Sequence, residues 1–253
     1  MGMAGVVDRK VVISGAASGI GRATAIRFAQ IGADVAVLDI NEKAALETVS
    51  MVTGAGRRGI FIRTDVTDFS QVKSAVAKVL EEFGQIDALA SVAGWNEHSF
   101  FTQQEPEFWH KVVAINLWGQ IHVARAVLDH MIERRKGAIV TVASDAGRVG
   151  TNGETIYAAA KGGVIAFTKS LAREVTRFGI RVNCICPGVS DTPMFQSVAG
   201  HQPKILESIV KLIPMRRIAN PDEIAEPIVF LASDSASYIT GQTLSVNGGL
   251  NML

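Results

Sequence analysis

The chain has 253 residues, 48% of them hydrophobic, and its formal net charge is +1. A charge so close to zero gives no broad field that would attract a nucleic acid. The longest apolar runs, such as VAVL and IVFLA, fall far short of the roughly 20 residues that cross a bilayer. No basic segment precedes a long apolar run at the amino terminus, as it would in a secretory signal. We therefore expect a cytoplasmic protein without nucleic-acid or membrane partners.

The cysteines and histidines argue against a disulfide or a metal site. Cys184 and Cys186 stand two residues apart in an expected strand, where their side chains face the same way. That geometry cannot close an unstrained disulfide. The five histidines show no paired ligand spacing. We predict reduced thiols, as in a reducing compartment, and no bound metal.

Short β-branched runs alternate with amphipathic helical stretches along the whole chain. The sequence predicts strands at 10–14, 34–39, 59–65, 87–94, 137–144, 180–188 and 242–246. Longer helices are predicted at 19–32, 41–52, 69–84, 105–132 and 155–178, with short helices after the sixth strand. Strands that are continuously apolar are buried on both faces, which is typical of a parallel sheet between two helical layers. We expect one α/β domain, 1–253, with a Rossmann-type doubly wound sheet of about seven strands.

A glycine-rich loop joins the first predicted strand to the first helix. Its sequence is SGAASGIG, residues 14–21. Gly15 permits a tight turn, Gly19 lets the backbone approach a pyrophosphate, and Gly21 allows the helix to lie close to the strand. The amino terminus of the helix would offer free N–H groups to phosphate oxygens. The strand–loop–helix context makes this loop a candidate dinucleotide site.

Asp39 ends the second predicted strand, about 20 residues after the loop, where a carboxylate would bond the ribose hydroxyls of a dinucleotide. The same charge would repel the 2′-phosphate of NADP. Ile40 follows it instead of an arginine, and Ser18 occupies a loop position where an arginine could contact that phosphate. These residues favour NAD over NADP. The alternative is that Asp39 only caps the next helix, a task for which Asn41 is available.

Tyr157 and Lys161 are separated by three alanines in the stretch YAAAK. On a helix the two side chains leave the same face, one turn apart. With this loop and its spacing to Ser144 and to the later stretch PGVSDTP, the chain resembles the classical short-chain dehydrogenase/reductases over almost its whole length. The family loop reads T-G-x-x-x-G-x-G, and here Ser14 takes the first position and keeps a hydroxyl.

The resemblance implies a catalytic tetrad of Asn116, Ser144, Tyr157 and Lys161. Tyr157 would exchange a proton with the substrate oxygen, which Ser144 would hold. Lys161 would bond the nicotinamide ribose, and Asn116 would position a water that relays protons to Lys161. A phenol titrates near 10, and a cation about 4 Å away at an effective dielectric near 20 could lower its pKa by roughly 3 units. We expect Lys161 to be that cation.

The resemblance also extends the cofactor site beyond the glycine loop. The full set of expected cofactor contacts is Gly15, Ser18, Gly19, Ile20, Gly21, Asp39, Ile40, Asp65, Val66, Ala93, Gly94, Tyr157, Lys161, Pro187, Gly188, Ser190 and Thr192. One departure is clear. The family usually has N-N-A-G after the fourth strand, and this chain has Ser91-Val92-Ala93-Gly94. That replacement puts in doubt the side-chain bonding that ties this strand to its neighbours.

Residues on either side of the tetrad are candidates for the substrate pocket. Trp95, His98, Ser144, Arg148 and Asn152 are the expected substrate contacts. Phe100, Phe101 and Glu154 lie close to them in the sequence, and 189–213 looks like a lid. The aromatic residues could instead simply pack under that lid.

Short stretches such as Gly94–Trp95 are similar to dehydrogenases of 2-hydroxycyclohexanecarboxyl-coenzyme A within the family. We therefore expect an NAD-dependent oxidoreductase that interconverts a secondary alcohol and a ketone, with a cyclic hydroxyacyl-coenzyme A or a related alcohol as substrate. One alternative is a 3-oxoacyl-(acyl-carrier-protein) reductase-like ketoreductase. Another, of a different class, is a non-catalytic dinucleotide sensor. The family pairs helices such as 155–178 in a four-helix interface, which implies a homotetramer, with a smaller interface near the carboxyl terminus.

Overall fold

A computed structural model describes residues 5–199 and 203–252. It contains one parallel sheet of 7 strands in the order β3-β2-β1-β4-β5-β6-β7. The strands are β1 (Lys10–Ser14), β2 (Asp34–Asp39), β3 (Gly59–Arg63), β4 (Ala88–Ser91), β5 (Gly137–Val142), β6 (Ile180–Pro187) and β7 (Thr243–Val246). This topology confirms the predicted Rossmann-type fold.

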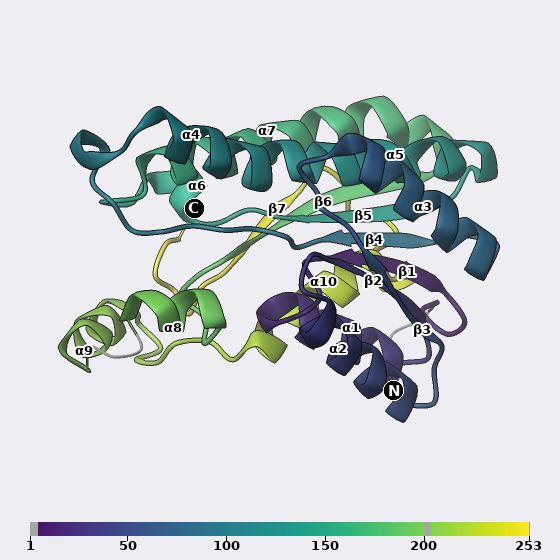
Figure 1. The fold of residues 1–253 in the computed structure, drawn as a ribbon, viewed down its shortest axis with the longest axis horizontal. Helices are drawn as coiled ribbons and strands as arrows, with labels where there is room; N and C mark the ends of the chain where they lie inside the picture. Colours follow the sequence, from purple (N-terminus) through teal and green to yellow (C-terminus); the bar gives the residue numbers. More distant parts are fainter. Residues whose placement is uncertain (1–4, 200–202, 253) are drawn as a thin grey trace.

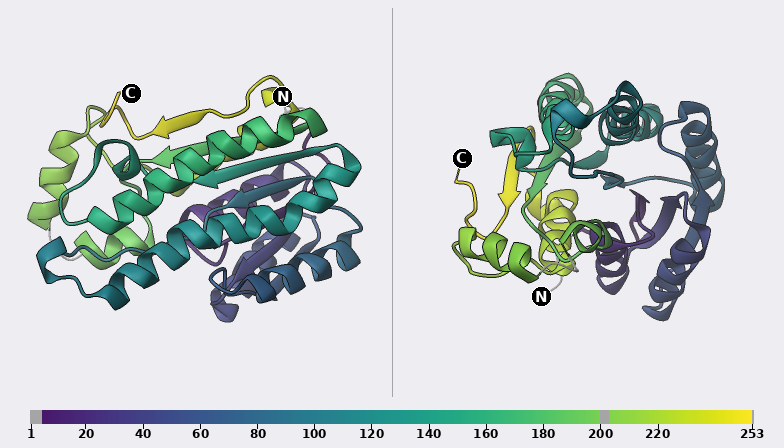
Figure 2. Two further views of the ribbon diagram at one scale, coloured as in Figure 1. Left: turned by 90° about the horizontal axis from the view of Figure 1, so that it is seen from above. Right: turned by 60° about the vertical axis from the view of Figure 1, so that its left-hand side comes forward.

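Helices cover both faces of the sheet. They are α1 (Gly19–Gln30), α2 (Glu42–Gly54), α3 (Phe69–Phe83), α4 (Pro106–Val113), α5 (Gly119–Arg134), α6 (Ala146–Val149), α7 (Thr155–Val175), α8 (Pro193–Ala199), α9 (Pro203–Leu212) and α10 (Pro221–Ala232). In Figure 1, α3, α4, α5 and α7 lie above the sheet and α1, α2 and α10 lie below it. Figure 2 shows the same two layers from other directions. No helix in the described part of the chain has the length and hydropathy of a bilayer span.

The central strands are apolar on both faces, as predicted. Val11 and Ile13 of β1 belong to the apolar cluster that includes Phe28 of α1. Val12, between them, belongs to a second cluster on the other face with Val79 of α3 and Val127 of α5. Alternate residues of one strand therefore contribute to separate cores, which fixes the strand register.

Two predicted elements differ from the structure. The strand predicted over 87–94 ends at Ser91, because Val92, Ala93 and Gly94 leave the sheet and line the large cavity described below. The helix predicted over 105–132 is divided into α4 and α5 by a π-helical turn, Ala114–Trp118. Shorter 3-10 turns lie at Phe101–Gln103, Thr176–Phe178 and Asp234–Ala236.

Strand β4 keeps a polar side-chain contact with its neighbour although Ser91 and Val92 stand where the family usually has two asparagines. The hydroxyl oxygens of Ser14 and Ser91 are 3.4 Å apart and both residues are buried. The two serines are also register partners in the β1–β4 pair. A direct side-chain contact therefore joins β1 to β4 at the point where both strands end.

Candidate active site

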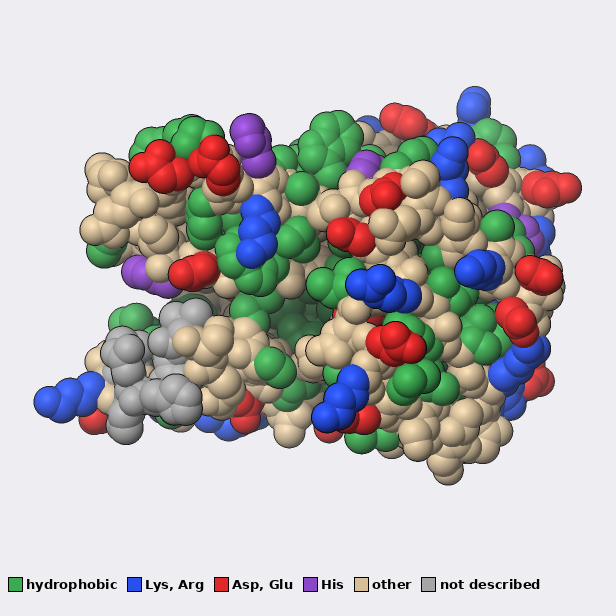
Figure 3. Space-filling model, in the orientation of Figure 1, with side chains coloured by type: hydrophobic (Ala, Val, Ile, Leu, Met, Phe, Trp, Pro, Cys, Tyr) green, Lys and Arg blue, Asp and Glu red, His purple; other side chains and the backbone are tan. Residues whose placement is uncertain are grey.

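A large cavity with a volume of about 1430 Å³ lies at the carboxyl ends of the strands. Figure 3 shows this face of the molecule hollowed between α4 and the segment that contains α8 and α9. Every expected cofactor position, from Gly15 to Thr192, lines the cavity. Ligands of open α/β sheets bind at this edge, outside the carboxyl ends of the strands.

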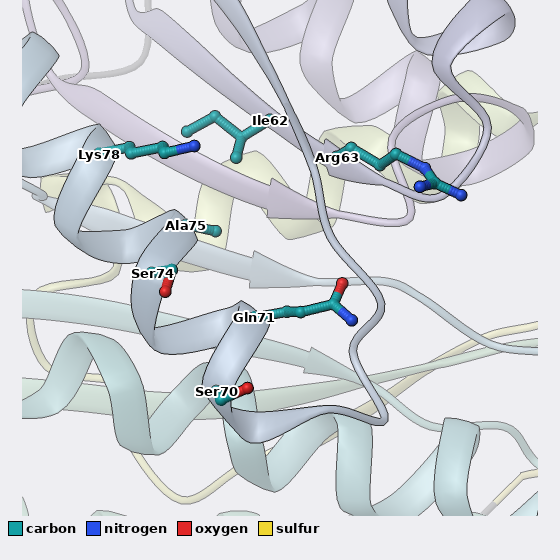
Figure 4. A pocket seen from close by; sticks show the side chains of 7 residues that line it. All are labelled: Ile62, Arg63, Ser70, Gln71, Ser74, Ala75 and Lys78. Carbon is teal, nitrogen blue, oxygen red and sulfur yellow. The ribbon is translucent and has the colours of Figure 1, made fainter.

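A smaller groove of about 240 Å³ lies elsewhere, between β3 and α3. It contains none of the expected site residues (Figure 4). Its lining residues are Ile62, Arg63, Ser70, Gln71, Ser74, Ala75 and Lys78. We therefore place the candidate active site in the large cavity alone.

The glycine loop fits a dinucleotide phosphate. Gly15 has φ +72°, and a Cβ added to it would lie 2.6 Å from the Cα of Ala93. A Cβ on Gly21 would lie 2.1 Å from the carbonyl oxygen of Gly15. Ser18 makes no side-chain cap, and no acidic residue stands in the first turn of α1. The amino terminus of α1 thus offers its N–H groups and its positive dipole end to an anion.

Asp39 is held with its carboxylate at the cavity wall. One oxygen accepts a hydrogen bond from the backbone N–H of Ala17, and the other accepts one from the N–H of Asn41, both at 2.9 Å. Asn41 itself caps α2 by accepting from the N–H of Ala44. The capping alternative for Asp39 is therefore wrong, and its carboxylate lines the cavity.

Asp65 and Val66 line the same end of the cavity as Asp39 and Ile40. The Asp65 carboxylate accepts from the backbone N–H of Thr67 at 2.9 Å and from its hydroxyl at 2.7 Å. The carbonyl oxygen of Val66 lies 2.9 Å from Nδ1 of His122. The turn after β3 is therefore fixed by its own hydrogen bonds and by α5.

Ser144, Tyr157 and Lys161 meet in the middle of the cavity. Ser144 follows β5, and its hydroxyl oxygen accepts from the N–H of Ala146 at 3.2 Å. Tyr157 stands in the first turn of α7. The Lys161 Nζ lies 5.6 Å from the centre of the Tyr157 ring and donates to the carbonyl of Val142 at 2.8 Å. The predicted juxtaposition of the phenol and the ammonium is therefore present.

The electrostatic effect expected of Lys161 is not present. Burial raises the pKa of Tyr157 above its usual value, and the Glu154 carboxylate raises this pKa further, whereas a hydrogen bond with Ser144 lowers it. Burial also lowers the pKa of Lys161 to about 8, against the influence of the neighbouring Cys184 and Cys186. These shifts run against the expectation that Lys161 lowers the phenol pKa toward neutrality, because burial and the Glu154 carboxylate both disfavour the charged phenolate.

Asn116 lies behind the cavity wall and is fully buried. It belongs to the π-helical turn, a feature often found at functional sites. Its amide nitrogen donates to the carbonyls of Trp95 at 2.6 Å and Val112 at 2.9 Å, and its oxygen accepts from the N–H of Trp95 at 3.2 Å. Asn116 thus fixes the backbone of Trp95. The family resemblance implies only that Asn116 positions a water molecule, and it does not predict this contact.

The expected substrate residues divide into two groups. Trp95, His98 and Asn152 line the cavity with Ser144. Arg148 does not line it, and its guanidinium donates to the hydroxyl of Ser245 at 2.8 Å, so the expectation of an Arg148 substrate contact is not supported by its position. Phe100 and Phe101 also lie outside the lining, and both are exposed.

Several cavity residues were not predicted from the sequence. Lys111 places its ammonium 3.6 Å from the centre of the Trp95 ring. Asn96 donates to the Glu154 carboxylate at 2.8 Å. In both cases the partners come from segments far apart in the chain, and the sequence contains no signal that pairs them.

The carboxyl-terminal segment reaches the site through Asp145, which is only 4% exposed. Its carboxylate accepts hydrogen bonds from Ser245 and Asn247, and a longer one of 3.4 Å from Asn251. Leu250 and Asn251 in turn line the cavity. Asp145, which directly follows Ser144, is thus bonded to a segment about 100 positions later in the chain.

The segment predicted as a lid borders the cavity. Met194 and Phe195 of α8 and Ile209 and Leu212 of α9 all line it. Residues 200–202 of the predicted lid lie outside the described part of the chain. The apolar side chains of α8 and α9 therefore share the lining of the cavity with Ser144 and Tyr157.

Comparison with known proteins agrees with this geometry. A family model described as enoyl-(acyl carrier protein) reductase matches residues 15–251. The chain is 40% identical to the 3-oxoacyl-(acyl-carrier-protein) reductase FabG of Thermotoga maritima, covering 94% of this chain and 96% of the relative. It is 36% identical to the (3R)-3-hydroxyacyl-CoA dehydrogenase of Canis lupus familiaris, covering 95% of both chains.

The fold also matches solved structures over nearly its full length. The crystal structure of levodione reductase aligns with a TM-score of 0.93 and 34% identity, covering 96% of this chain and 97% of that one. Two of these three proteins are named for 3-oxoacyl or 3-hydroxyacyl thioesters, and the third for a different ketone.

Proposed function

The chain belongs to the short-chain dehydrogenase/reductase family, and from that premise we propose that it interconverts a 3-oxoacyl thioester and its 3-hydroxy form with NAD. The observation that supports this most is that Ser144, Tyr157 and Lys161 share one cavity with the glycine loop and Asp39. The chain itself supplies the residues for proton transfer. The dinucleotide, when bound, would supply or accept the hydride.

In the reducing direction Tyr157 is the proton donor. Burial and Glu154 raise the pKa of Tyr157, so the free phenol stays protonated at neutral pH and can act as a general acid. Ser144 and Tyr157 would together hold the substrate carbonyl oxygen by donating hydrogen bonds to it. Oxidation requires the same phenol to lose its proton first, and its raised pKa opposes that step. The free site therefore favours reduction.

The choice of NAD rests on Asp39. Its two oxygens are fixed by backbone N–H groups at the cavity wall, so the carboxylate cannot turn away from a 2′-phosphate without losing both bonds. A like charge there costs binding energy unless a cation neutralises it. Ser18 and Ile40, which also line this end, offer no cation.

The relatives shift the substrate class from the expected cyclic hydroxyacyl-coenzyme A toward the 3-oxoacyl alternative. Both curated relatives quoted above are named for thioesters with oxygen on the third carbon. A cyclic ketone remains a second candidate for one reason. Trp95 lines the cavity, where its aromatic side chain could pack against a cyclic substrate, and its ring is held edge-on against Phe108 with ring centres 5.7 Å apart.

The proposal is tested by NADH consumption with acetoacetyl-coenzyme A and with 2-methylcyclohexanone as the competing ketone. We expect the thioester to be reduced with the higher kcat/KM. We expect Tyr157→Phe to lose about 10³-fold in kcat, because general acid catalysis contributes that order of magnitude, and to keep its affinity for NADH. Absence of turnover with both ketones, while NADH still binds, would favour the dinucleotide sensor instead.

We also propose a homotetramer. Trp118, between α4 and α5, is 52% exposed, and Leu244 of β7 is 44% exposed, so apolar side chains remain uncovered on the α5–α7 side and near the carboxyl terminus. Both regions are those expected to form subunit interfaces. Light scattering at micromolar concentration should give about four times the monomer mass of 26.9 kDa. A monomeric mass would contradict the proposal.

The free thiols of Cys184 and Cys186 fit the expected cytoplasmic location.

A further inference from the structure

Glu154 is a carboxylate that faces the cavity instead of capping its helix. It occupies the cap position before α7, yet its side chain bonds no N–H of that helix. Its Oε1 instead accepts from Nδ2 of Asn96 at 2.8 Å, and both residues line the cavity. Within residues 5–199 and 203–252, no group donates a hydrogen bond to its second oxygen, Oε2. One acceptor atom of a fixed carboxylate is therefore available to the cavity.

The position of Glu154 brings its charge close to the reacting group. It stands one helical turn before Tyr157, on the same side of α7. Both residues line the cavity, and the Glu154 carboxylate raises the pKa of Tyr157 because a nearby negative charge disfavours the phenolate. Burial also raises the pKa of Glu154 itself, so water screens its charge only in part.

The cations near Glu154 are engaged elsewhere. Lys111 lies over the Trp95 ring, and Lys161 donates to the Val142 carbonyl. His98 faces Glu154 and is the one basic group that acts on its pKa. In the part of the chain that the structure describes, the Glu154 carboxylate therefore stands beside the proton donor without an ion pair to a lysine or an arginine.

We propose that Glu154, held by Asn96, is a charge filter that admits neutral carbonyl substrates and rejects the corresponding 3-oxo acid anions. The inference rests on the proposed function, because the substrate carbonyl must reach the Ser144 and Tyr157 hydroxyls. A substituent two bonds from that carbonyl then lies near the Asn96–Glu154 pair. A thioester or ester is neutral there and is accepted, whereas a free carboxylate meets a like charge in a partly desolvated site. Glu154 is thus a specificity-determining residue for this reaction.

The test compares methyl acetoacetate with acetoacetate, which share the 3-oxo group and differ in the charge of the terminal group and by one methyl. The wild-type enzyme should prefer the ester in kcat/KM by about 100-fold, the order expected for like charges a few ångströms apart at an effective dielectric near 20. Glu154→Gln keeps an acceptor for Asn96 and removes the charge, so we expect it to reduce this preference by about 100-fold. An unchanged ratio in Glu154→Gln would overturn the proposal.

Glu97→Gln is the matched control. Glu97 also lines the cavity but is exposed to solvent, so its charge is screened. We expect its ester-to-acid ratio to stay within about twofold of the wild type, since exposed charges interact weakly. Equal shifts in both variants would show a general surface effect and would contradict a specific role for Glu154.

A binding measurement tests the charge discrimination by Glu154 independently of whether the proposed reaction occurs. Trp95 lines the cavity, so its fluorescence, taken as the difference between the wild type and Trp95→Phe, reports occupancy without turnover. If no 3-oxoacyl compound is reduced, the proposed function fails, and titration with the ester and the acid still tests the filter. Tighter binding of the ester, with the difference reduced in Glu154→Gln, supports it. Equal affinities of the wild type for both compounds overturn it.

Discussion

The two halves of the cavity are built in different ways. The half that we propose for the cofactor contains strand ends, a glycine loop and a carboxylate fixed by backbone N–H groups, most of them within the first 94 residues. The loop after β6, with Pro187, Gly188, Ser190 and Thr192, completes it. The substrate half is formed by side chains from separate segments, such as Asn96 with Glu154 and Asp145 with Ser245. The first half depends on local backbone geometry and the second on long-range pairing. Substitutions should therefore affect the two halves differently.

The largest expected effect on the free energy of unfolding concerns Lys161, which lies between the two halves of the cavity. This lysine is 2% exposed, and burial lowers its pKa from 10.5 to about 8. Below pH 8 the folded state holds a desolvated charge, and as the pH rises toward 10.5 the folded state gives up this proton before the unfolded state does. Stability should therefore rise over that interval. Lys161→Met should stabilise the protein by about 3 kcal/mol at pH 7.

Urea unfolding of the wild type and Lys161→Met at pH 7 and at pH 10 measures this effect. The advantage of Lys161→Met should shrink at pH 10, where the wild-type lysine is neutral in the folded state. A difference in stability that does not change with pH would show that the buried ammonium is not the cause.

Next in size is a change to the cofactor half at Gly21. The added Cβ of Gly21→Ala would lie 2.1 Å from a backbone oxygen that cannot move without opening the loop. We expect a loss of about 2 kcal/mol in unfolding free energy, together with weaker NADH binding. Gly54→Ala is the control, because Gly54 is also helical and an added Cβ meets nothing within 4 Å. That variant should be neutral or slightly more stable, and equal losses in both would contradict the close approach.

The corresponding change in the substrate half is Asp145→Asn. Ser245 and Asn247 donate to different oxygens of the carboxylate, and an amide replaces one of these oxygens by an NH2 group, so one of the two donors would lose its acceptor. We expect a loss of about 1.5 kcal/mol in stability and a raised KM for the ketone, with KM for NADH unchanged. Asp129→Asn, in an exposed pair with Arg125, should cost about 0.4 kcal/mol. A raised KM for NADH in Asp145→Asn would contradict the division into two halves.

The smallest expected effect concerns cofactor choice. Asp39→Ser removes the charge that opposes a 2′-phosphate and introduces a hydroxyl that can donate a hydrogen bond. The ratio of kcat/KM for NADPH to that for NADH should rise about tenfold, or roughly 1.4 kcal/mol. Steady-state assays with both cofactors at a fixed ketone concentration give this ratio. A wild-type enzyme that uses NADPH as well as NADH would contradict the interpretation of Asp39.

The sequence placed the expected cofactor residues on one cavity because their determinants are local. Gly15, Gly21 and Asp39 lie in one strand–loop–helix–strand unit, and the alternation of apolar strands with helices along the chain predicted the parallel sheet. The substrate half was predicted poorly because its contacts join distant segments. Asn96 and Glu154 are 58 residues apart, and no periodicity signals that pairing. The raised pKa of Tyr157 likewise depends on burial, which the YAAAK spacing does not reveal.

The π-helical turn shows the same limit within one helix. The apolar pattern of 105–132 is continuous, so it predicted one helix. The structure breaks it where the Asn116 side chain bonds the backbone of Trp95 from another loop. A tertiary contact thus decides the local conformation there.

The central claim is that Tyr157 supplies the proton while the dinucleotide reduces the substrate carbonyl in this cavity. The most direct test is a single turnover of acetoacetyl-coenzyme A with NADH deuterated at the transferable position, followed by mass spectrometry of the product. The wild type should yield 3-hydroxybutyryl-coenzyme A with deuterium on the third carbon, and Tyr157→Phe, with NADH bound, should yield almost none. Labelled product formed at an undiminished rate by Tyr157→Phe, or product without deuterium from the wild type, would contradict the claim.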